Sequence, residues 1–204
     1  MSAPVEMAAF DFDGTLTWCD SFPLFLLYAA GLTGFLRRVP QLLRLWFSYR
    51  RKRRSYDDVK QAVIQLFFTG DSVNRLQNKA TAFARTVLPR LLRPAVMDCL
   101  RAHQRAGRLC VIVSASLEIY LQPWADQYAA SAAVLGSRLE AMGDRLTGRL
   151  DGLNCAGPEK FRRLEAFGRA HQARVSYAYG NSSHDVAMLK MADHAFYKMK
   201  PYAA

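Results

Sequence analysis

Met7-Ala-Ala-Phe-Asp-Phe-Asp-Gly-Thr-Leu-Thr17 is the stretch that decides how this chain folds. Its first four residues form an apolar run typical of a buried strand. Two carboxylates, Asp11 and Asp13, follow one residue apart, and Gly14 then permits a sharp turn. Carboxylates this close repel each other, and a bound cation is the simplest way to offset that repulsion. The stretch therefore predicts a strand that ends in a cation-binding turn, with solvated turn acids as the alternative.

Length and composition favour one domain, or one domain with an insertion. The chain has 204 residues, of which 51% are hydrophobic and 22% charged, so it can bury a sizeable core. Its cysteines are scattered without a CxxC pair, which favours reduced, buried thiols in a cytosolic protein; they are Cys19, Cys99, Cys110 and Cys155. We expect the protein to be cytoplasmic, either free or peripheral on the inner face of the membrane.

The apolar stretch 22–36 is not expected to be a signal peptide or a membrane span. It follows the acidic motif, no basic leader precedes it, and cleavage behind it would discard that motif. It is also shorter than the ~20 apolar residues that a spanning helix needs. Pro23, Gly31 and Gly34 interrupt it further.

Two different patterns divide the chain. Helical patterns dominate first, and we expect helices over 21–30, with breaks at Gly31 and Gly34, and over 39–49, 57–68 and 72–88. From Pro94 helices alternate with strands; the expected strands are 109–113, 132–135, 175–179 and 195–199, with a hairpin over 138–150. This alternation predicts an α/β fold, a three-layer, Rossmann-like, mainly parallel sheet covered on both faces. Residues 1–20 and 89–204 should form the sheet domain, and 21–88 an all-α cap inserted after the first strand.

Polar turns follow three of the expected strands, at Asp11–Thr15, Ser114–Ser116 and Gly180–Asp185. Because the carboxyl ends of parallel strands meet at one edge of a sheet, these turns should share a crevice. Lys160, at the start of a separate helix, should join them. Carboxylates and carbonyls suit Mg²⁺, whereas lysine and backbone N–H groups suit phosphate. The sequence therefore predicts a site for a phosphate ester and a divalent cation.

The three polar turns and the helix start at Lys160 make four elements. Their order along the chain resembles that of the signature motifs of haloacid dehalogenase superfamily phosphatases, in the subfamily whose cap follows the first motif. The resemblance spans residues 7–198. Residues 111–118 and 154–160 are most similar to the phosphoserine-phosphatase-like branch, which includes phosphatidylglycerophosphatase C-type proteins. The resemblance implies Mg²⁺-dependent hydrolysis of a phosphomonoester through an aspartyl-phosphate intermediate.

The resemblance also implies a role for each matching residue. Asp11 would be the nucleophile, and Asp13 the general acid and then the general base. Mg²⁺ would be held by Asp11, the backbone carbonyl of Asp13 and the last loop, and Asp185 would orient metal-bound water or Lys160. The phosphate-binding residues would be Gly14, Thr15, Ser114, Ala115 and Lys160, and the metal-binding residues Asp11, Asp13, Asn181 and Asp185.

Two further positions bear on this site. The family's last loop usually begins Gly-Asp, whereas this chain has Asn181, which keeps an oxygen ligand but removes one negative charge. We therefore expect weaker Mg²⁺ binding without loss of catalysis. Asp20 and Ser21 either cap the first helix of the cap or face the substrate at the entry of the cap.

The net charge of +11 is concentrated in the expected cap. No acidic residue lies between Ser21 and Tyr56, and eight basic residues do: Arg37, Arg38, Arg44, Arg50, Arg51, Lys52, Arg53 and Arg54. Three interpretations of these side chains are open. They are solvated surface charges, or they dock with Trp46 and Phe47 on an anionic membrane, or they attract acidic substrates to the site. Nucleic-acid binding is less favoured, because no recognised nucleic-acid module accompanies the charge.

The expected partner is a phosphorylated substrate, and a membrane-associated phospholipid such as phosphatidylglycerophosphate is the leading candidate. A soluble phosphomonoester such as phosphoserine is the alternative within the enzyme class. A catalytically weak protein that binds membranes or nucleic acid is the alternative outside it. The sequence indicates no oligomeric state.

Overall fold

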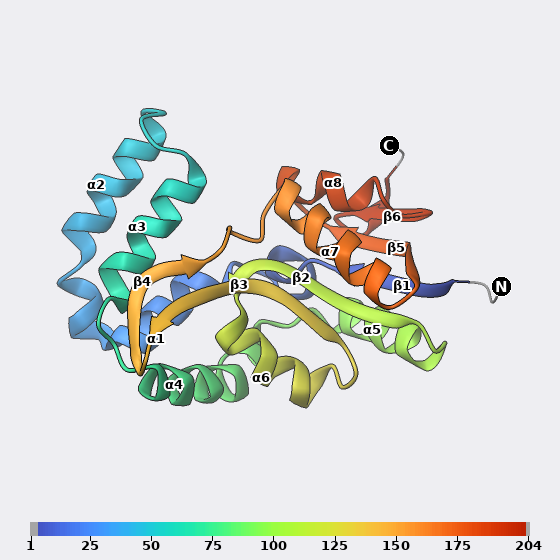
Figure 1. The fold of residues 1–204 in the computed structure, drawn as a ribbon, viewed down its shortest axis with the longest axis horizontal. Coiled ribbons are helices and arrows are strands. Elements are labelled where there is room, and N and C mark those ends of the chain that lie inside the picture. The colour runs from blue at the N-terminus through green and yellow to red at the C-terminus, as the bar shows by residue number, and fades with distance from the viewer. Residues whose placement is uncertain (1–3, 203–204) are drawn as a thin grey trace.

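A computed structural model describes residues 4–202 and contains a seven-stranded sheet with helices on both of its faces (Figure 1). Across the sheet the strand order is β4-β3-β2-β1-β5-β6-β7. The strands are β1 (Val5–Phe10), β2 (Leu109–Leu117), β3 (Ala133–Met142), β4 (Arg145–Asp151), β5 (Ala173–Gly180), β6 (His194–Tyr197) and β7 (Lys200–Pro201).

The five inner strands are parallel to one another, and only β4 and β7, at the two edges, are antiparallel to their neighbours. The predicted mainly parallel α/β sheet is therefore confirmed. Because β1 lies between β2 and β5, the turn that follows β1 is flanked by the carboxyl ends of both neighbours.

The side chains of β1 alternate between two apolar layers, as a strand buried on both faces requires. Ala8 and Phe10 belong to one core cluster, whereas Met7 and Ala9 belong to the other. The first layer is covered by α5 (Pro94–Arg105) and α6 (Glu118–Tyr128), and the second by α7 (Pro158–Ala170) and α8 (Val186–Leu189). The expected three layers are thus present.

Helices occupy the stretch between β1 and α5, as predicted. They follow a short turn, η1 (Phe12–Leu16), and are α1 (Ser21–Leu36), α2 (Val39–Arg50), α3 (Tyr56–Phe68), α4 (Val73–Thr86) and the short η2 (Leu88–Leu91). Gly31 breaks the first of them with a φ of 69° and a ψ of 166°. Gly34 was expected to be a second break, but it is helical, because α1 resumes after Gly31 and continues to Leu36.

Two strands continue through polar residues where the sequence predicted a turn or a separate hairpin arm. β2 was expected to end at Val113, yet it continues past an irregularity to Leu117, because Leu117 still pairs with Ser137. β3 and the first arm of the predicted hairpin are one strand. Its first half pairs with β2 and its second half with β4, so backbone pairing extends the strand through its polar residues.

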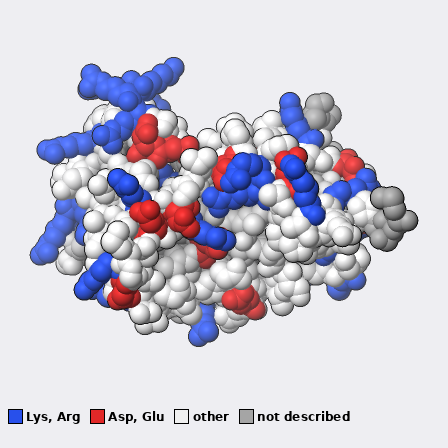
Figure 2. Space-filling model, viewed as in Figure 1, with Lys and Arg blue, Asp and Glu red and all other residues white. Residues whose placement is uncertain are grey.

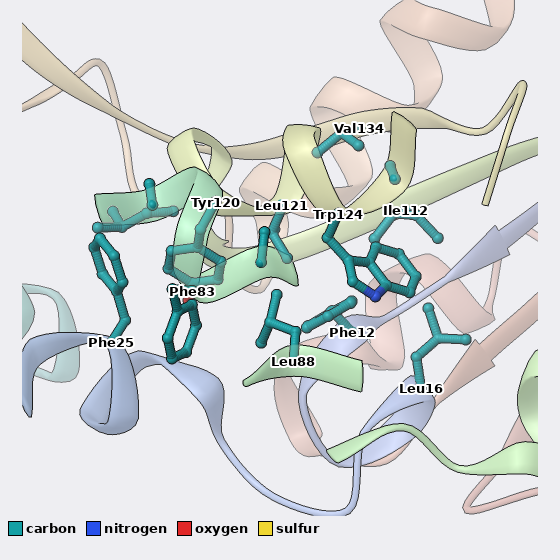
Figure 3. Packing of buried hydrophobic residues seen from close by; sticks show 14 of the residues in the cluster. Phe12, Leu16, Phe25, Phe83, Leu88, Ile112, Tyr120, Leu121, Trp124 and Val134 are labelled. Carbon is teal, nitrogen blue, oxygen red and sulfur yellow. The ribbon is translucent and has the colours of Figure 1, made fainter. Parts of the chain in front are cut away.

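One apolar cluster joins the inserted helices to the sheet (Figure 3). Phe25 of α1 and Phe83 of α4 lie 4.8 and 5.4 Å, between ring centroids, from Tyr120 of α6. On the same side, Phe12 packs edge-on against Trp124 with centroids 4.8 Å apart. The rings at the centre of this cluster are completely buried. The insertion and the sheet therefore share a core.

The β3–β4 hairpin makes a second connection to the inserted helices (Figure 1). Leu146 of β4 accepts a backbone hydrogen bond from Gly70 (2.8 Å) and donates one to Asp71 (2.9 Å), both in the link between α3 and α4. The side-chain amide of Gln61, on α3, donates to the carbonyl of Gly148 (2.8 Å). These bonds hold the tip of the hairpin on the insertion.

Over residues 4–202, none of the helices is by itself long and apolar enough for a membrane span. The consecutive helices α1 and α2 satisfy that test only as a pair, and they are bent by 111° relative to each other.

Candidate active site

The turn after β1 brings Asp11 to the edge of the sheet. Gly14 has a φ of 75°, which favours glycine, and a side chain at this position would clash with the amide of Asn181. The amide of Gly14 donates to Thr17 Oγ1 (3.2 Å), which closes the turn. The hydroxyl of Thr15 donates to Asp11 Oδ2 (3.0 Å). The chain therefore folds back on itself so that Asp11 and the last loop meet.

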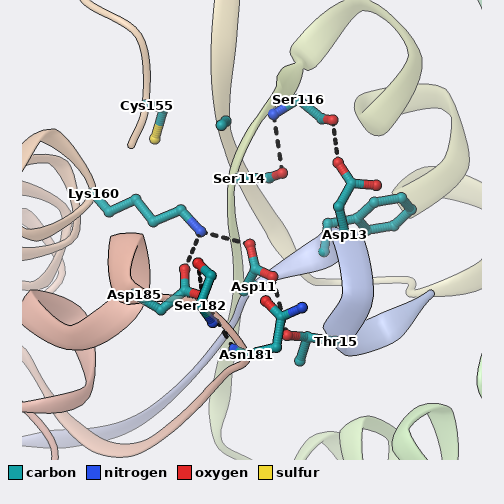
Figure 4. Close-up of polar contacts among 12 residues, drawn as sticks. Asp11, Asp13, Thr15, Ser114, Ser116, Cys155, Lys160, Asn181, Ser182 and Asp185 are labelled. Carbon is teal, nitrogen blue, oxygen red and sulfur yellow. Dashed lines mark hydrogen bonds and ion pairs between the residues drawn. The ribbon is translucent and has the colours of Figure 1, made fainter. Parts of the chain in front are cut away.

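Lys160 lies between two buried carboxylates (Figure 4). Its ammonium donates to Asp11 Oδ1 and to Asp185 Oδ1, at 2.5 Å each. Pro158 begins α7, a position where its fixed φ suits the helix, and this places Lys160 in the first turn. The side chains predicted from three separate motifs are thus in direct contact.

The loop after β5 holds Asp185 in one orientation. Its second oxygen, Oδ2, accepts from the amide of Asn181 (3.1 Å), the amide of Ser182 (2.9 Å) and the Ser182 hydroxyl (2.8 Å). Gly180 makes this possible, because a Cβ there would lie 2.6 Å from the Cβ of Asp185. Asp185 therefore orients Lys160 and the loop amides.

These contacts set the charge states of the cluster. Burial raises the pKa of Asp11 from 3.8 to about 6, because Lys160 is shared with Asp185 and only partly offsets the loss of water. Burial also opposes the charge of Lys160, but the two carboxylates outweigh it and raise the pKa of Lys160. For Asp185, burial is outweighed by Lys160 and the donors of the loop, so its pKa is lowered. Lys160 and Asp185 therefore form a charged ion pair. The carboxylate of Asp11 takes up a proton more readily than that of Asp185, because its pKa is raised.

Asp13 is bound outside this cluster, by residues at the end of β2 and the start of α1. Its Oδ1 accepts from the amide of Ser21 (2.8 Å), and its Oδ2 accepts from the hydroxyl of Ser116. Burial, followed by the nearby charge of Asp20, raises the pKa of Asp13 to about 7. Two carboxylates one residue apart therefore have different surroundings, and such a difference is what allows neighbouring acids to take different roles.

A cavity of about 360 Å³ opens above these groups. Among the predicted site residues, those that line it are Asp11, Asp13, Gly14, Asp20, Ser114, Ala115, Lys160 and Asn181. Thr15 and Asp185 lie beneath it, where each contacts a lining residue. Aromatic side chains complete the wall: Trp18, Phe22, Tyr56 and His184.

Asp20 and Ser21, at the start of α1, have different surroundings. Asp20 caps the helix by accepting from the amide of Phe22 (2.9 Å), and it also lines the cavity. Ser21 is completely buried, and its hydroxyl contacts Tyr120 (3.1 Å) and Ser116 (3.3 Å). Asp20 thus faces the cavity, whereas Ser21 supports Asp13 through its amide.

Two of the four cysteines depart from the expectation of buried thiols, since Cys99 is only half-buried and Cys19 departs furthest. Cys19 is exposed and lines the cavity, because it follows the η1 turn at the surface, whereas Cys110 and Cys155 are buried. All four thiols are free.

Sequence reasoning missed Lys60 and Ser116. Lys60 reaches from α3 into the sheet, where its ammonium donates to the carbonyl of Ala115, to Asn154 Oδ1 and to Ser137 Oγ (3.2 Å). Lys60 stands three and four residues before Val63 and Ile64, both buried, and a lysine in such an apolar stripe is the signal that could have found it. Ser116 lay in the polar run after the predicted strand and was not given a role.

The donor set fits Mg²⁺ in the way that proteins usually bind it. Within residues 4–202 there is no group of three or more His, Cys, Asp and Glu side chains that could hold a metal alone. Mg²⁺ commonly takes one or two carboxylates and completes its shell with carbonyls, water and substrate phosphate. The candidate donors among the residues that line the cavity are Asp11, Asn181 and the backbone carbonyl of Asp13. Asp185 is already bound by four donors.

Comparison with known proteins is consistent with this geometry. Over residues 8–190 the chain matches the family described as haloacid dehalogenase-like hydrolase. It is 39% identical over 198 residues to Protein CicA of Caulobacter vibrioides, and the alignment covers 95% of this chain and 86% of that protein.

Solved structures share the fold. A protein of unknown function from Bordetella pertussis Tohama I superposes with a TM-score of 0.79 at 23% identity, covering 95% of this chain and 90% of that one. A phosphoserine phosphatase with a phospho-aspartyl intermediate analogue superposes with a TM-score of 0.66 at 14% identity, covering 96% of this chain and 87% of the other.

Proposed function

The chain belongs to the haloacid dehalogenase-like hydrolase family, and from that premise we propose that it is a phosphatase whose Asp11 accepts the phosphoryl group. One observation carries this proposal: Asp11 lines the cavity while its two oxygens are fixed by Lys160 and Thr15. A nucleophile needs such a fixed orientation toward the substrate. Its pKa of about 6 leaves it ionised at neutral pH.

Asp13 is the proton donor for the leaving oxygen in this proposal. A pKa of about 7 keeps a substantial share of Asp13 protonated at neutral pH. Ser116 and the amide of Ser21 hold its carboxyl at the cavity wall. After the alcohol leaves, the same carboxylate takes a proton from the water that hydrolyses the aspartyl-phosphate.

Lys160 and the turn after β1 bind the phosphoryl oxygens. Lys160 brings the fixed positive charge, and Ser114 and Ala115 also line the cavity. Mg²⁺, held by Asp11, the carbonyl of Asp13 and Asn181, would offset the negative charge shared by carboxylate and phosphate. Without such compensation, two anions would have to approach each other.

A phospholipid such as phosphatidylglycerophosphate is the substrate class that we propose. The wall contains Trp18, Phe22 and Tyr56, which suit a partly apolar leaving group. The second lysine of the cavity, Lys60, already donates to three protein acceptors, which disfavours a role in binding a substrate carboxylate. The related phosphoserine phosphatase keeps phosphoserine as the alternative.

Phosphate release from an aryl phosphate tests the reaction class. We expect activity that requires Mg²⁺, disappears in Asp11→Asn and persists in the control Asp98→Asn, whose side chain is exposed on α5. Activity that survives Asp11→Asn would remove the nucleophile assignment. A panel of lipid and soluble phosphomonoesters then decides the substrate: preference for phosphoserine would contradict the lipid proposal and leave the phosphatase intact.

A further inference from the structure

Helix α2 presents two apolar faces, and only one of them is covered. Leu42 and Leu45 pack against the core cluster. Leu43, Trp46 and Phe47 stand three and four residues apart, so they form an adjacent stripe that turns away from the core, and each is about half exposed, at 51%, 51% and 52%. We name this side, with Pro40, the outer face of α2. Surface helices rarely expose three large apolar side chains in one stripe.

Basic residues flank this outer face. By helical position Arg44 lies on one side of the stripe and Arg50 at its end, where its guanidinium lies 5.8 Å from the ring centroid of Trp46. The basic loop Arg51–Arg54 follows directly, and the cluster of Lys and Arg at this end of the molecule is visible in Figure 2. None of the ion pairs among residues 4–202 involves Arg44 or Arg50–Arg54. Their charges are available to a partner.

We propose that the outer face of α2 and the basic loop dock on an anionic lipid surface. An apolar stripe flanked by arginines is the pattern of helices that lie in the membrane interface. Leu43 and Phe47 would enter the acyl boundary, Trp46 would lie at the headgroup level, and the arginines would contact lipid phosphates. A nucleic acid would satisfy the charge but leave the apolar stripe in water.

The docking surface is close in the chain to the cavity. The basic loop ends two residues before Tyr56, which lines the cavity and lies 5.2 Å, between ring centroids, from His184. Only one short segment of chain therefore separates the basic loop, where the membrane would bind, from the wall of the cavity. Docking itself does not rest on the proposed phosphatase activity.

Co-sedimentation of the full chain with vesicles tests the proposal. We expect binding to phosphatidylcholine vesicles that contain phosphatidylglycerol, little binding to phosphatidylcholine alone, and release by high salt. Neutralising the basic loop with Arg51→Gln, Lys52→Gln, Arg53→Gln and Arg54→Gln should weaken binding by about tenfold or more. The matched control removes four exposed charges elsewhere: Arg101→Gln, Arg105→Gln, Arg169→Gln and Lys190→Gln.

The apolar stripe is tested separately. Trp46→Ser with Phe47→Ser should reduce vesicle binding, whereas Met142→Ser with Leu153→Ser, at exposed apolar positions on other elements, should leave it unchanged. Phosphatidylcholine brominated on its acyl chains is not a phosphomonoester and so is no substrate for the cavity beside Trp18; mixed into the anionic vesicles, it should quench tryptophan emission in the unmodified chain. Trp46→Phe should remove that quenching and Trp18→Phe should preserve it, although both indoles are exposed.

The contradicting results are specific. The proposal is wrong if the unmodified chain ignores anionic vesicles, if each control behaves like its test variant, or if quenching survives Trp46→Phe. Retention on vesicles through high salt would indicate insertion of the bent α1–α2 pair instead of surface docking. Binding of a duplex oligonucleotide through the basic loop, without vesicle binding, would make the partner a nucleic acid. Aryl phosphatase activity measured without vesicles reports separately on the active site.

Discussion

At the scale of single residues, the division of charge among four acidic and basic groups governs the candidate chemistry. Lys160 and Asp185 form a buried, oriented ion pair, and Asp11 shares that lysine. Asp13 is kept away from them by Ser116 and by the amide of Ser21. Of the two carboxylates that share Lys160, only Asp11 lines the cavity and has a raised pKa, whereas Asp185 is buried beneath it with a lowered pKa.

Asn181 offers a test of the proposed metal site. Asn181→Asp adds a carboxylate near Asp11, so we expect less Mg²⁺ to be needed for half-maximal activity. Without Mg²⁺ the same change should lower the melting temperature, because like charges then lie close together, and Mg²⁺ should restore it. Calorimetry with and without Mg²⁺ measures this independently of activity.

The control for this prediction is Asn181→Ala, which removes the oxygen and should raise the Mg²⁺ requirement. An unchanged requirement in both variants would place the metal away from Asn181.

At the scale of elements, Lys60 connects α3 to the sheet. Lys60→Met would leave buried acceptors on Ala115 and Asn154 without this donor, at a cost of about 1–3 kcal/mol in the free energy of unfolding. Denaturant unfolding measures the change, and Lys52→Met in the exposed loop is the control. A stability gain in Lys60→Met would show that burying the charge costs more than its hydrogen bonds contribute.

His103 makes the docking of α5 on the sheet sensitive to acid. It is buried and its Nε2 lies 2.9 Å from the hydroxyl of Tyr179. Burial, followed by the charge of Arg108, lowers the pKa of His103 below its usual 6.5. The unfolded chain therefore binds a proton at a higher pH than the folded chain, so stability falls as pH drops below about 6.5.

A series of unfolding curves against pH checks this prediction. The loss of stability between neutral pH and the folded-state pKa should be smaller in His103→Asn than in the unmodified chain. Equal pH dependence in the two proteins would show that other groups cause the acid sensitivity.

The elements also show what a sequence can predict. The apolar run at 7–10 and the alternation after Pro94 were sufficient to predict β1 and a mainly parallel sheet, since both depend on local pattern. The extension of β2 through Ser114 and Ser116 was missed, because strand pairing with β3 overrides the polar composition. Lys60 was missed for a similar reason: its partners lie on β2, β3 and the loop before α7, which only the folded chain brings together.

At the scale of the whole molecule, the inserted helices and the sheet share one apolar cluster, so we expect them to unfold as one cooperative unit. Phe83 of α4 is completely buried in the cluster that also contains Phe10 of β1. Phe83→Ala should therefore cost about 3–5 kcal/mol and shift one common transition, not a separate transition of the helices. Thermal unfolding followed by calorimetry, by far-ultraviolet circular dichroism and by near-ultraviolet circular dichroism checks this. Two resolved transitions would make the insertion an independent domain.

Charge at this scale is uneven, because eight basic residues of the insertion account for much of the net charge of +11. The active-site cluster carries opposing charges instead, and its lysine is neutralised by two carboxylates. The proposed membrane docking and the proposed chemistry at Asp11 thus depend on different parts of the molecule. Substitutions in one part should therefore abolish its function and leave the other intact.

Trapping the phosphoryl group on the protein tests the central claim most directly. The enzyme is mixed with substrate and Mg²⁺, quenched in acid and reduced with borohydride, which converts an aspartyl-phosphate into homoserine. We predict that peptide mass spectrometry finds homoserine at position 11 and no reduction at Asp13. Unmodified Asp11 during turnover, or a modification at another residue, would contradict the account.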